Sequence, residues 1–329
     1  MKYRRLGQYG MRVSEVSLGA WTTFGGSVDD SQAHEIIHKA LELGVNFIDN
    51  ADVYSRGQAE TVVGEALAGD TYDRKNLVLS SKVFWPYSDT PNDSGLSRKH
   101  IMDSIHGTLD RYDQDYIDIY YCHRFDWRTP LRETIETMDD LVRDGLIRYW
   151  GTSVWSAANL ERAIGIAKEI GARLPAVEQP RYNMLDRYIE LEVMETTAYH
   201  GMGITPWSPL QYGILSGKYN NDIPEGSRLA NNERFQDNLT DEVLEKVKKL
   251  TALAGEHDMS MAQLALAWIL RRDEISSVIT GATKLSHIES NVEASEVTLS
   301  QDTLDQIEEI LDNKPEMHGP YQPALADRS

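Results

Sequence analysis

Four polar side chains in this sequence are of the types that exchange protons, and each stands at or near the end of an apolar run. Asp49 ends the run at residues 46–49, and Tyr54 follows five residues later. Lys82 and His123 stand at the ends of the next two apolar runs. A phenol with an ordinary pKa of about 10 is a weak acid near neutral pH, but a neighbouring ammonium favours the phenolate. We therefore expect Lys82 to lower the pKa of Tyr54.

The other two side chains complete a set that can protonate an alkoxide. Asp49 beside Lys82 would keep the ammonium charged and oriented. The imidazole of His123 can hydrogen-bond a carbonyl oxygen and share in the proton transfer. Reduction of a carbonyl also needs a hydride, which no side chain supplies, so the set implies a redox cofactor.

Short apolar runs alternate with amphipathic stretches, and this alternation predicts the elements that hold these side chains. Strands are expected at residues 16–19, 46–49, 76–80, 116–121, 146–151, 176–178, 203–207 and 277–280. Helices are expected at residues 29–43, 59–67, 97–111, 130–143, 157–170, 188–199, 241–256, 262–272 and 285–294. Eight strands, each followed by helix, predict an α/β fold of the (β/α)8 TIM barrel type, whose active site lies on the loops after the strands. The residues at those strand ends are Trp21, Asp49, Lys82, His123, Ser153, Gln179, Trp207 with Ser208, and Gly281.

Three segments fall outside this repeat. Residues 3–13 are expected to form an N-terminal β-hairpin that closes the bottom of the barrel, and residues 300–311 an extra C-terminal helix. Residues 317–329 show no periodicity. We therefore predict a single barrel domain over residues 1–312, followed by a surface tail over residues 313–329.

The composition narrows the function classes. The chain has 329 residues, with 33 basic and 52 acidic side chains and a net charge of −19. Such an acidic surface argues against nucleic acid and against an anionic membrane as partners. Cys122 is the single cysteine, which excludes an internal disulfide and a Cys-based zinc site. No run reaches the ~20 apolar residues of a membrane span, and no signal peptide is recognised, so we expect a cytoplasmic protein without membrane insertion.

Three local patterns are interpreted as unrelated to the chemistry. Residues 34–38 match H-E-x-x-H, but both histidines and the glutamate lie on the polar face of a helix, which we expect to point to solvent, so no metal site is predicted. Residues 213–218 resemble a P-loop with one residue too few between the glycines. Cys122 adjoins His123, but neighbours in a strand point to opposite faces, so we interpret it as a buried structural thiol.

Several segments, taken together, resemble those of the aldo-keto reductases. The chain is most similar to the branch of that family that contains the β subunits of voltage-gated potassium channels. The segments that carry the resemblance are Leu18-Gly19-Ala20-Trp21, Phe47-Ile48-Asp49, Asp52-Val53-Tyr54, Ser81-Lys82-Val83-Phe84-Trp85, Tyr149-Trp150-Gly151-Thr152-Ser153, Glu178-Gln179, Trp207-Ser208-Pro209-Leu210, Gly213, Gly217-Lys218-Tyr219 and Gly281-Ala282-Thr283.

The resemblance implies a barrel that binds NADPH or NADP+ without a Rossmann domain and takes a small-molecule carbonyl as substrate. It implies Tyr54 as the proton donor, Asp49 and Lys82 as the groups that tune it, and His123 as the partner that orients the carbonyl. The residues that it assigns to the cofactor are Gly19, Ala20, Trp21, Asp49, Ser153, Gln179, Trp207, Ser208, Pro209, Leu210, Gly213, Lys218, Ser227, Arg228, Gly281, Thr283, His287 and Asn291. The residues assigned to the substrate are Trp21, Tyr54, Trp85, His123 and Trp127.

At some positions the sequence differs from the family that it resembles. These differences leave the function and the cofactor preference open. Channel β subunits carry Asn at the position of His123, and His is typical of active reductases, so the first interpretation is an NADPH-dependent reductase of aldehydes and ketones. The alternative is an NADPH-binding regulatory module with little turnover. His287 stands where many relatives place an arginine, so NADH is an option beside NADPH. A homo-oligomer is compatible with either function, and the physiological substrate is not identified by the sequence.

Overall fold

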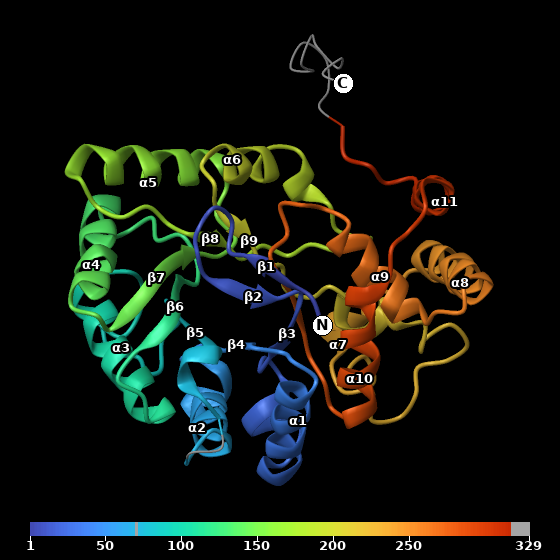
Figure 1. The fold of residues 1–329 in the computed structure, drawn as a ribbon, viewed down its shortest axis with the longest axis horizontal. Coiled ribbons are helices and arrows are strands. Elements are labelled where there is room, and N and C mark those ends of the chain that lie inside the picture. Colours follow the sequence, from blue (N-terminus) through green and yellow to red (C-terminus); the bar gives the residue numbers. More distant parts are fainter. Residues whose placement is uncertain (70–71, 317–329) are drawn as a thin grey trace.

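Eight parallel strands in the described residues form a curled sheet around the core of the molecule (Figure 1). The computed structural model describes residues 1–69 and 72–316. The strands, in sheet order, are β10 (Val278–Thr280), β3 (Val16–Gly19), β4 (Phe47–Asp49), β5 (Val78–Val83), β6 (Ile117–Cys122), β7 (Ile147–Thr152), β8 (Val177–Glu178) and β9 (Gly203–Ile204). Ile204 forms a parallel bridge with Ile275, just before β10, so the sheet closes on itself. The predicted (β/α)8 barrel is confirmed.

Helices surround the strands and cover their outer face (Figure 1). They are α1 (Asp30–Glu42), α2 (Gln58–Ala66), α3 (Arg98–Tyr112), α4 (Leu131–Arg143), α5 (Ala157–Ile170), α6 (Val193–Tyr199), α7 (Glu233–Gln236), α8 (Asp241–Glu256), α9 (Met261–Leu270), α10 (Leu285–Glu293) and α11 (Gln301–Leu311). Side chains at several first positions accept a backbone N–H of the first turn, as Ser97 does for α3 and Ser156 for α5. Each such cap contributes about 1 kcal/mol. Gly171 ends α5 at φ 68°, a conformation that favours glycine.

One predicted helix is broken. The sequence predicts a continuous helix over residues 188–199, but the structure has a single 3-10 turn at Tyr188–Glu190 and starts α6 at Val193. Glu192 lies between them with a non-helical φ of −142° and ψ of −36°. Glu190, at the end of the 3-10 turn, accepts hydrogen bonds from Tyr182 and Arg187.

The N-terminal hairpin closes one end of the barrel. β1 (Tyr3–Arg5) pairs with β2 (Arg12–Ser14) in antiparallel register, and the pair lies across the ring of strands in Figure 1. Leu6 and Val13 are fully buried in one apolar cluster with Phe47, Val78, Ile119, Tyr121, Ala176 and Val177. Several of these partners stand at the first residues of their strands, so the hairpin seals the amino-terminal end, as predicted. The opposite end stays open for a site.

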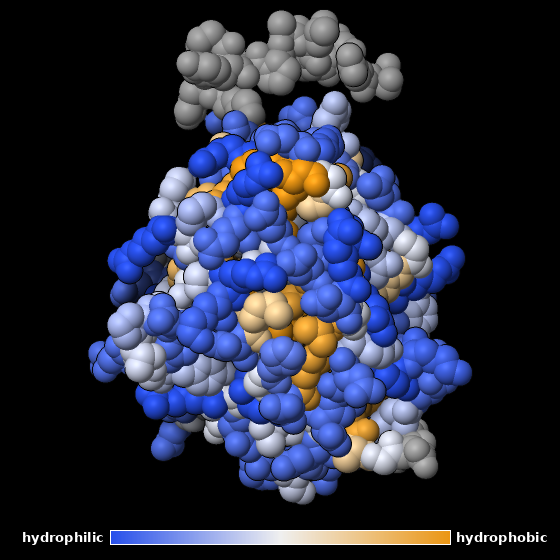
Figure 2. All heavy atoms as spheres, turned by 90° about the vertical axis from the view of Figure 1, so that its left-hand side faces the viewer, coloured by the Kyte–Doolittle hydropathy of each residue, from blue (hydrophilic) through white to orange (hydrophobic). Residues whose placement is uncertain are grey.

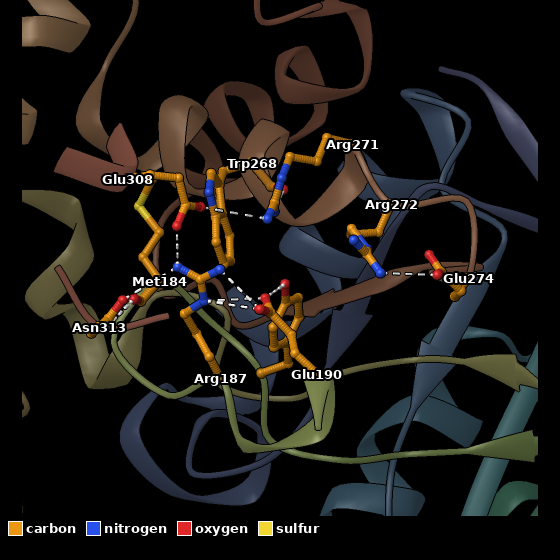
Figure 3. A network of polar contacts seen from close by, with 10 residues as sticks. Met184, Arg187, Glu190, Trp268, Arg271, Arg272, Glu274, Glu308 and Asn313 are labelled. Atoms are coloured by element: carbon orange, nitrogen blue, oxygen red, sulfur yellow. Dashed lines mark hydrogen bonds and ion pairs between the residues drawn. The ribbon is translucent and has the colours of Figure 1, made fainter. Parts of the chain in front are cut away.

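The extra C-terminal helix is attached through a buried guanidinium (Figure 3). Arg187, whose side chain is 3% exposed, pairs with Glu190 at 2.8 Å and with Glu308 of α11 at 2.7 Å. Asn313 donates to the carbonyl of Met184 at 2.8 Å. These contacts hold α11 against residues 182–190, the segment that comes after one of the strand ends of the site.

One face of the molecule is mostly polar. Figure 2 shows this face, which carries α3 and α4, with a few patches of hydrophobic residues among hydrophilic ones. Within the described part of the chain, no helix combines the length and apolarity needed to span a bilayer. The predicted tail is described only at residues 313–316; residues 317–329 lie outside the described residues.

Candidate active site

A cavity of about 1400 Å³ lies at the open end of the barrel, where the strands end. It is walled by strand ends and the loops that follow them, with Gly19 at the end of β3, His123 after β6 and Gly281 after β10. The sequence-predicted residues that line it are Gly19, Trp21, Asp49, Tyr54, Trp85, His123, Ser153, Gln179, Trp207, Ser208, Pro209, Leu210, Gly213, Lys218, Ser227, Arg228, Gly281, Thr283, His287 and Asn291. Parallel strands thus bring side chains from distant parts of the chain to one mouth.

The four proton-exchanging side chains meet at the bottom of this cavity. Lys82 Nζ lies 2.7 Å from Asp49 Oδ2 and 3.2 Å from Tyr54 Oη. The rings of Tyr54 and His123 approach edge to face, with centroids 5.9 Å apart. Tyr54 therefore contacts the buried ion pair through its hydroxyl group and the imidazole through its ring.

The ion pair behind Tyr54 is fully desolvated and fully bonded. Lys82 is 0% exposed and also donates to the carbonyl of Asn50. Asp49 Oδ1 accepts from Ser80 Oγ and from Gln179 Nε2, both at 2.8 Å. Burial lowers the pKa of Lys82, but the charge of Asp49 and the hydrogen bonds to Asp49 and Tyr54 outweigh it and raise that pKa above its usual 10.5. The ammonium therefore stays charged at neutral pH.

Tyr54 remains protonated in this environment. Burial raises the pKa of Tyr54 above its usual 10.0, and the Lys82 ammonium opposes that rise. The sequence-based expectation of a lowered pKa is therefore wrong for the site as described, because it left out the cost of placing a phenolate in a buried position. The protonated state is useful chemically: the phenol has a proton to give, and a cation stands 3.2 Å away to stabilise the resulting charge.

His123 is a neutral hydrogen-bonding group. Burial lowers its pKa well below 6.5, and the charges of Lys82 and Arg124 lower it further. Its Nδ1 atom is buried with no hydrogen-bond partner in the described residues. A neutral imidazole has no readily released proton at neutral pH, so of these two rings the phenol of Tyr54 is the one suited to donate a proton, and His123 is suited to form a hydrogen bond with a ligand.

The loops around the cavity hold strained backbone. Ser55, Val154, Ser208 and Tyr212 are not glycines, yet their φ angles are 48°, 58°, 52° and 58°. This left-handed conformation is costly for such residues and is maintained only where surrounding contacts enforce it. Its concentration beside the cavity is typical of a functional site.

Part of the cavity lining suits phosphate groups. Lys218 and Arg228 line it, and the segment 208–217 turns repeatedly through left-handed backbone, a geometry that forms concave sites for anions. Gly213 has φ 95°, a backbone conformation that favours glycine. The residues present therefore suit a phosphate-bearing cofactor.

Three predicted residues lie away from the cavity wall. Lys82 stands behind Tyr54 rather than on the surface of the cavity, so it can act only through that phenol. Ala20 is fully buried, and its backbone N–H donates to the Asp49 carbonyl. Trp127, predicted to contact substrate, is 76% exposed, packs on Phe125 and is not part of the cavity lining. Its contact with substrate stays a prediction.

Other lining residues were missed by the sequence reasoning. Arg124 directly follows His123, and Arg181 stands two residues after Gln179, so both belong to strand ends already recognised. Extending each strand end by two residues would have found them. Phe235 stacks on Tyr212 with centroids 4.2 Å apart and comes from the short helix α7, which no sequence pattern predicted.

The H-E-x-x-H match at residues 34–38 and Cys122 are explained by packing. His38 Nε2 lies 2.8 Å from the carbonyl of Ala66, and His34 faces Glu65 at 3.9 Å, so both histidines pack against α2 rather than pointing to solvent as expected. In residues 1–69 and 72–316, no three His, Cys, Asp or Glu side chains cluster as metal ligands would. Cys122 is fully buried, which raises the pKa of its thiol.

A second buried carboxyl supports the Tyr54 loop from behind. Asp52 Oδ2 accepts from Ser104 Oγ at 2.7 Å, whereas Oδ1 has no partner in the described residues. Burial raises the pKa of Asp52 to about 7. The native state therefore resists ionisation of Asp52, while the unfolded chain ionises it near its ordinary pKa of about 3.9.

This difference predicts a pH-dependent stabilisation by Asp52→Asn. The cost of the buried carboxylate is absent below pH 4 and grows as the pH rises to about 7. The variant should therefore gain about 2–3 kcal/mol relative to wild type between pH 5 and pH 8, as measured by urea unfolding. The exposed control Asp115→Asn should show no such trend. If the stability difference between Asp52→Asn and wild type did not change with pH, the raised pKa of Asp52 would be contradicted.

Comparisons with known proteins agree on one family. The model of the aldo/keto reductase family matches residues 15–312. A probable voltage-gated potassium channel subunit beta from Arabidopsis thaliana is 43% identical over 98% of this chain and its own full length. The corresponding protein of Oryza sativa is 42% identical over the same shares. A putative voltage-gated potassium channel subunit beta from Schizosaccharomyces pombe is 38% identical over 95% of this chain and 94% of its own length.

Proposed function

The chain belongs to the aldo/keto reductase family, a family of oxidoreductases, and from that premise we propose that it reduces aldehydes or ketones to alcohols with NADPH. The observation that carries the proposal is the connected set Asp49–Lys82–Tyr54 at the bottom of a 1400 Å³ cavity. A buried lysine held by an aspartate and aimed at a phenol suits proton donation to an alkoxide. The neutral imidazole of His123 beside the phenol suits a carbonyl oxygen as the acceptor.

The side chains would act together on the carbonyl oxygen. Bound NADPH would supply the hydride that no side chain can supply. Tyr54 Oη would give its proton to the oxygen as negative charge develops there. Lys82, 3.2 Å from Tyr54 Oη, would stabilise the phenolate that remains, in a site where low polarity strengthens the attraction. His123 would donate a hydrogen bond to the same oxygen and fix its position.

Other lining residues are assigned to the cofactor by the resemblance and by their chemistry. Ser153 and Gln179 would hold the carboxamide, and Trp207 would lie against the nicotinamide. Lys218 and Arg228 would bind phosphates, since both are cations at the far end of the cavity. The remaining adenosine contacts would come from Thr283, His287 and Asn291.

Arg228 gives the first test of this assignment. Its guanidinium is half-buried, makes no ion pair among the described residues, and has its pKa lowered by burial. We expect Arg228→Gln to raise KM for NADPH about tenfold, because a charge-assisted hydrogen bond to phosphate is lost. The exposed control Arg162→Gln should leave KM unchanged. An unchanged KM in Arg228→Gln would remove Arg228 from the cofactor site.

Wild-type protein should also prefer NADPH to NADH. The comparison is steady-state kcat/KM for the two cofactors with 4-nitrobenzaldehyde as the second substrate. Thr283, Lys284 and Arg228 offer the contacts for the additional phosphate. Equal efficiencies would withdraw the preference and leave the proposed reduction itself standing.

The second candidate function is an NADPH-binding module that regulates a membrane partner with little turnover. The names of the three similar proteins, all channel β subunits, favour it. His123 beside Tyr54 favours the reductase. Turnover with any member of a panel of aldehydes and ketones separates the two, because a regulator would bind NADPH and leave it unoxidised.

A further inference from the structure

The cavity has the opposite charge from the rest of the molecule. The whole chain has 52 acidic and 33 basic side chains. The cavity lining instead contains the cations Arg124, Arg181, Lys218, Arg228 and Arg234, against Asp49 as the acidic residue that lines it. Asp49 is already neutralised by Lys82 at 2.7 Å. The lining therefore attracts anions, and it does so at both ends rather than only where phosphates would bind.

Arg124 stands at the substrate end of this lining. It follows His123 directly, and its Cζ lies 5.7 Å from the ring centroid of Trp85. Trp85 in turn packs edge to face on His123, with centroids 6.3 Å apart. A molecule held at the Tyr54 hydroxyl would therefore have this guanidinium beside it.

The donors of Arg124 are largely unused. The residues described include no carboxylate within ion-pair distance of it, and one of its nitrogens donates to the carbonyl of His123. Arg181 differs, because Asp186 pairs with it and Tyr212 lies 3.5 Å away. A guanidinium has five N–H donors, so Arg124 keeps N–H groups that can donate two parallel hydrogen bonds to a planar anion.

The buried carboxyl of Glu178 does not take this role. Glu178 accepts hydrogen bonds from Thr152 Oγ1 and from the backbone N–H of Trp155, and it is fully buried behind the cavity wall. Glu178 forms no ion pair with Arg124 among the described residues. A half-buried cation without a partner is costly unless a ligand supplies one.

We infer that Arg124 is a specificity residue that selects carbonyl substrates carrying a carboxylate. This inference rests on the proposed function, since it names the substrate class of the same site. One free guanidinium matches the single charge and planar geometry of a carboxylate, which it can bind through two parallel hydrogen bonds. The apolar face of Trp85 would cover the chain or ring between the carbonyl and the carboxylate.

The test uses two aldehydes of the same shape and different charge. 4-Carboxybenzaldehyde is an anion at neutral pH, and 4-carbamoylbenzaldehyde is its neutral amide. We expect wild-type kcat/KM to be about tenfold higher for the anion, as a charge-assisted pair predicts. Arg124→Gln should remove this ratio, Arg124→Lys should keep part of it, and the exposed control Arg128→Gln should leave it unchanged. A ratio near one in wild type, or the same ratio in Arg124→Gln, would overturn the inference.

A binding measurement separates this inference from the proposed reduction. Calorimetric titration of each aldehyde into protein saturated with NADP+ reports affinity without any turnover. Tighter binding of the anion that depends on Arg124 would support the specificity site even if neither aldehyde were reduced. Equal affinities in wild type would overturn it even if both were reduced. Equal losses for both aldehydes in Arg124→Gln would show a structural role only.

Discussion

Replacement of Tyr54 by phenylalanine is expected to lower kcat for aldehyde reduction by roughly 10² to 10⁴, the contribution typical of a positioned general acid. The change removes one oxygen, and Lys82 keeps its bonds to Asp49 and to the carbonyl of Asn50. The fold and the cavity should therefore survive. The measurement is NADPH oxidation with 4-nitrobenzaldehyde, and NADPH binding is monitored separately by fluorescence.

The matched control for this prediction is Tyr199→Phe. Tyr199 is 82% exposed at the end of α6 and does not line the cavity. Its variant should turn over like wild type. If Tyr54→Phe kept wild-type kcat, the phenol would not be the acid. If it lost NADPH binding in parallel with turnover, the loss would not report on proton transfer.

Removal of the Lys82 ammonium should produce the largest loss of stability. Lys82→Met leaves the Asp49 carboxylate buried and uncompensated, and breaking a buried ion pair in this way costs about 3–5 kcal/mol. The accompanying loss of kcat should be at least as large as that of Tyr54→Phe, because the cation that stabilises the phenolate charge is gone. Urea unfolding at pH 7 measures the stability.

The double variant Lys82→Met with Asp49→Asn separates charge from packing. Since the second change removes the unpaired carboxylate, it should recover much of the lost stability without restoring activity. Lys99→Met, at an exposed ion pair with Asp103, should change the stability little. A Lys82→Met protein as stable as wild type would contradict a buried charged pair.

The barrel and the meeting of the four side chains were predictable for one physical reason. Parallel strands run in the same direction, so residues at or next to the carboxyl ends of β4, β5 and β6 must gather at the same rim. Asp49, Lys82 and His123 stand at those positions. The helices were predictable because polar caps and apolar periodicity mark both ends, as in α5 and α8.

The remaining features depend on contacts that a linear pattern does not encode. The left-handed turns at Ser55 and Tyr212 are held by tertiary packing. Serine and tyrosine do not favour this conformation, so the residue types do not predict it. The exposure of Trp127 depends on the path of its loop, which the sequence pattern does not give. The pKa of Tyr54 depends on how deeply the phenol is buried, which spacing cannot give.

The proposed reduction is tested most directly by a single turnover of the protein–NADPH complex. The preformed complex is mixed with excess 4-nitrobenzaldehyde in a stopped-flow instrument, and NADPH absorbance and the alcohol product are measured together. We predict one equivalent of 4-nitrobenzyl alcohol for each NADPH consumed. NADPH that stays bound and unoxidised with this aldehyde and with a panel of other aldehydes and ketones would contradict the proposed reduction.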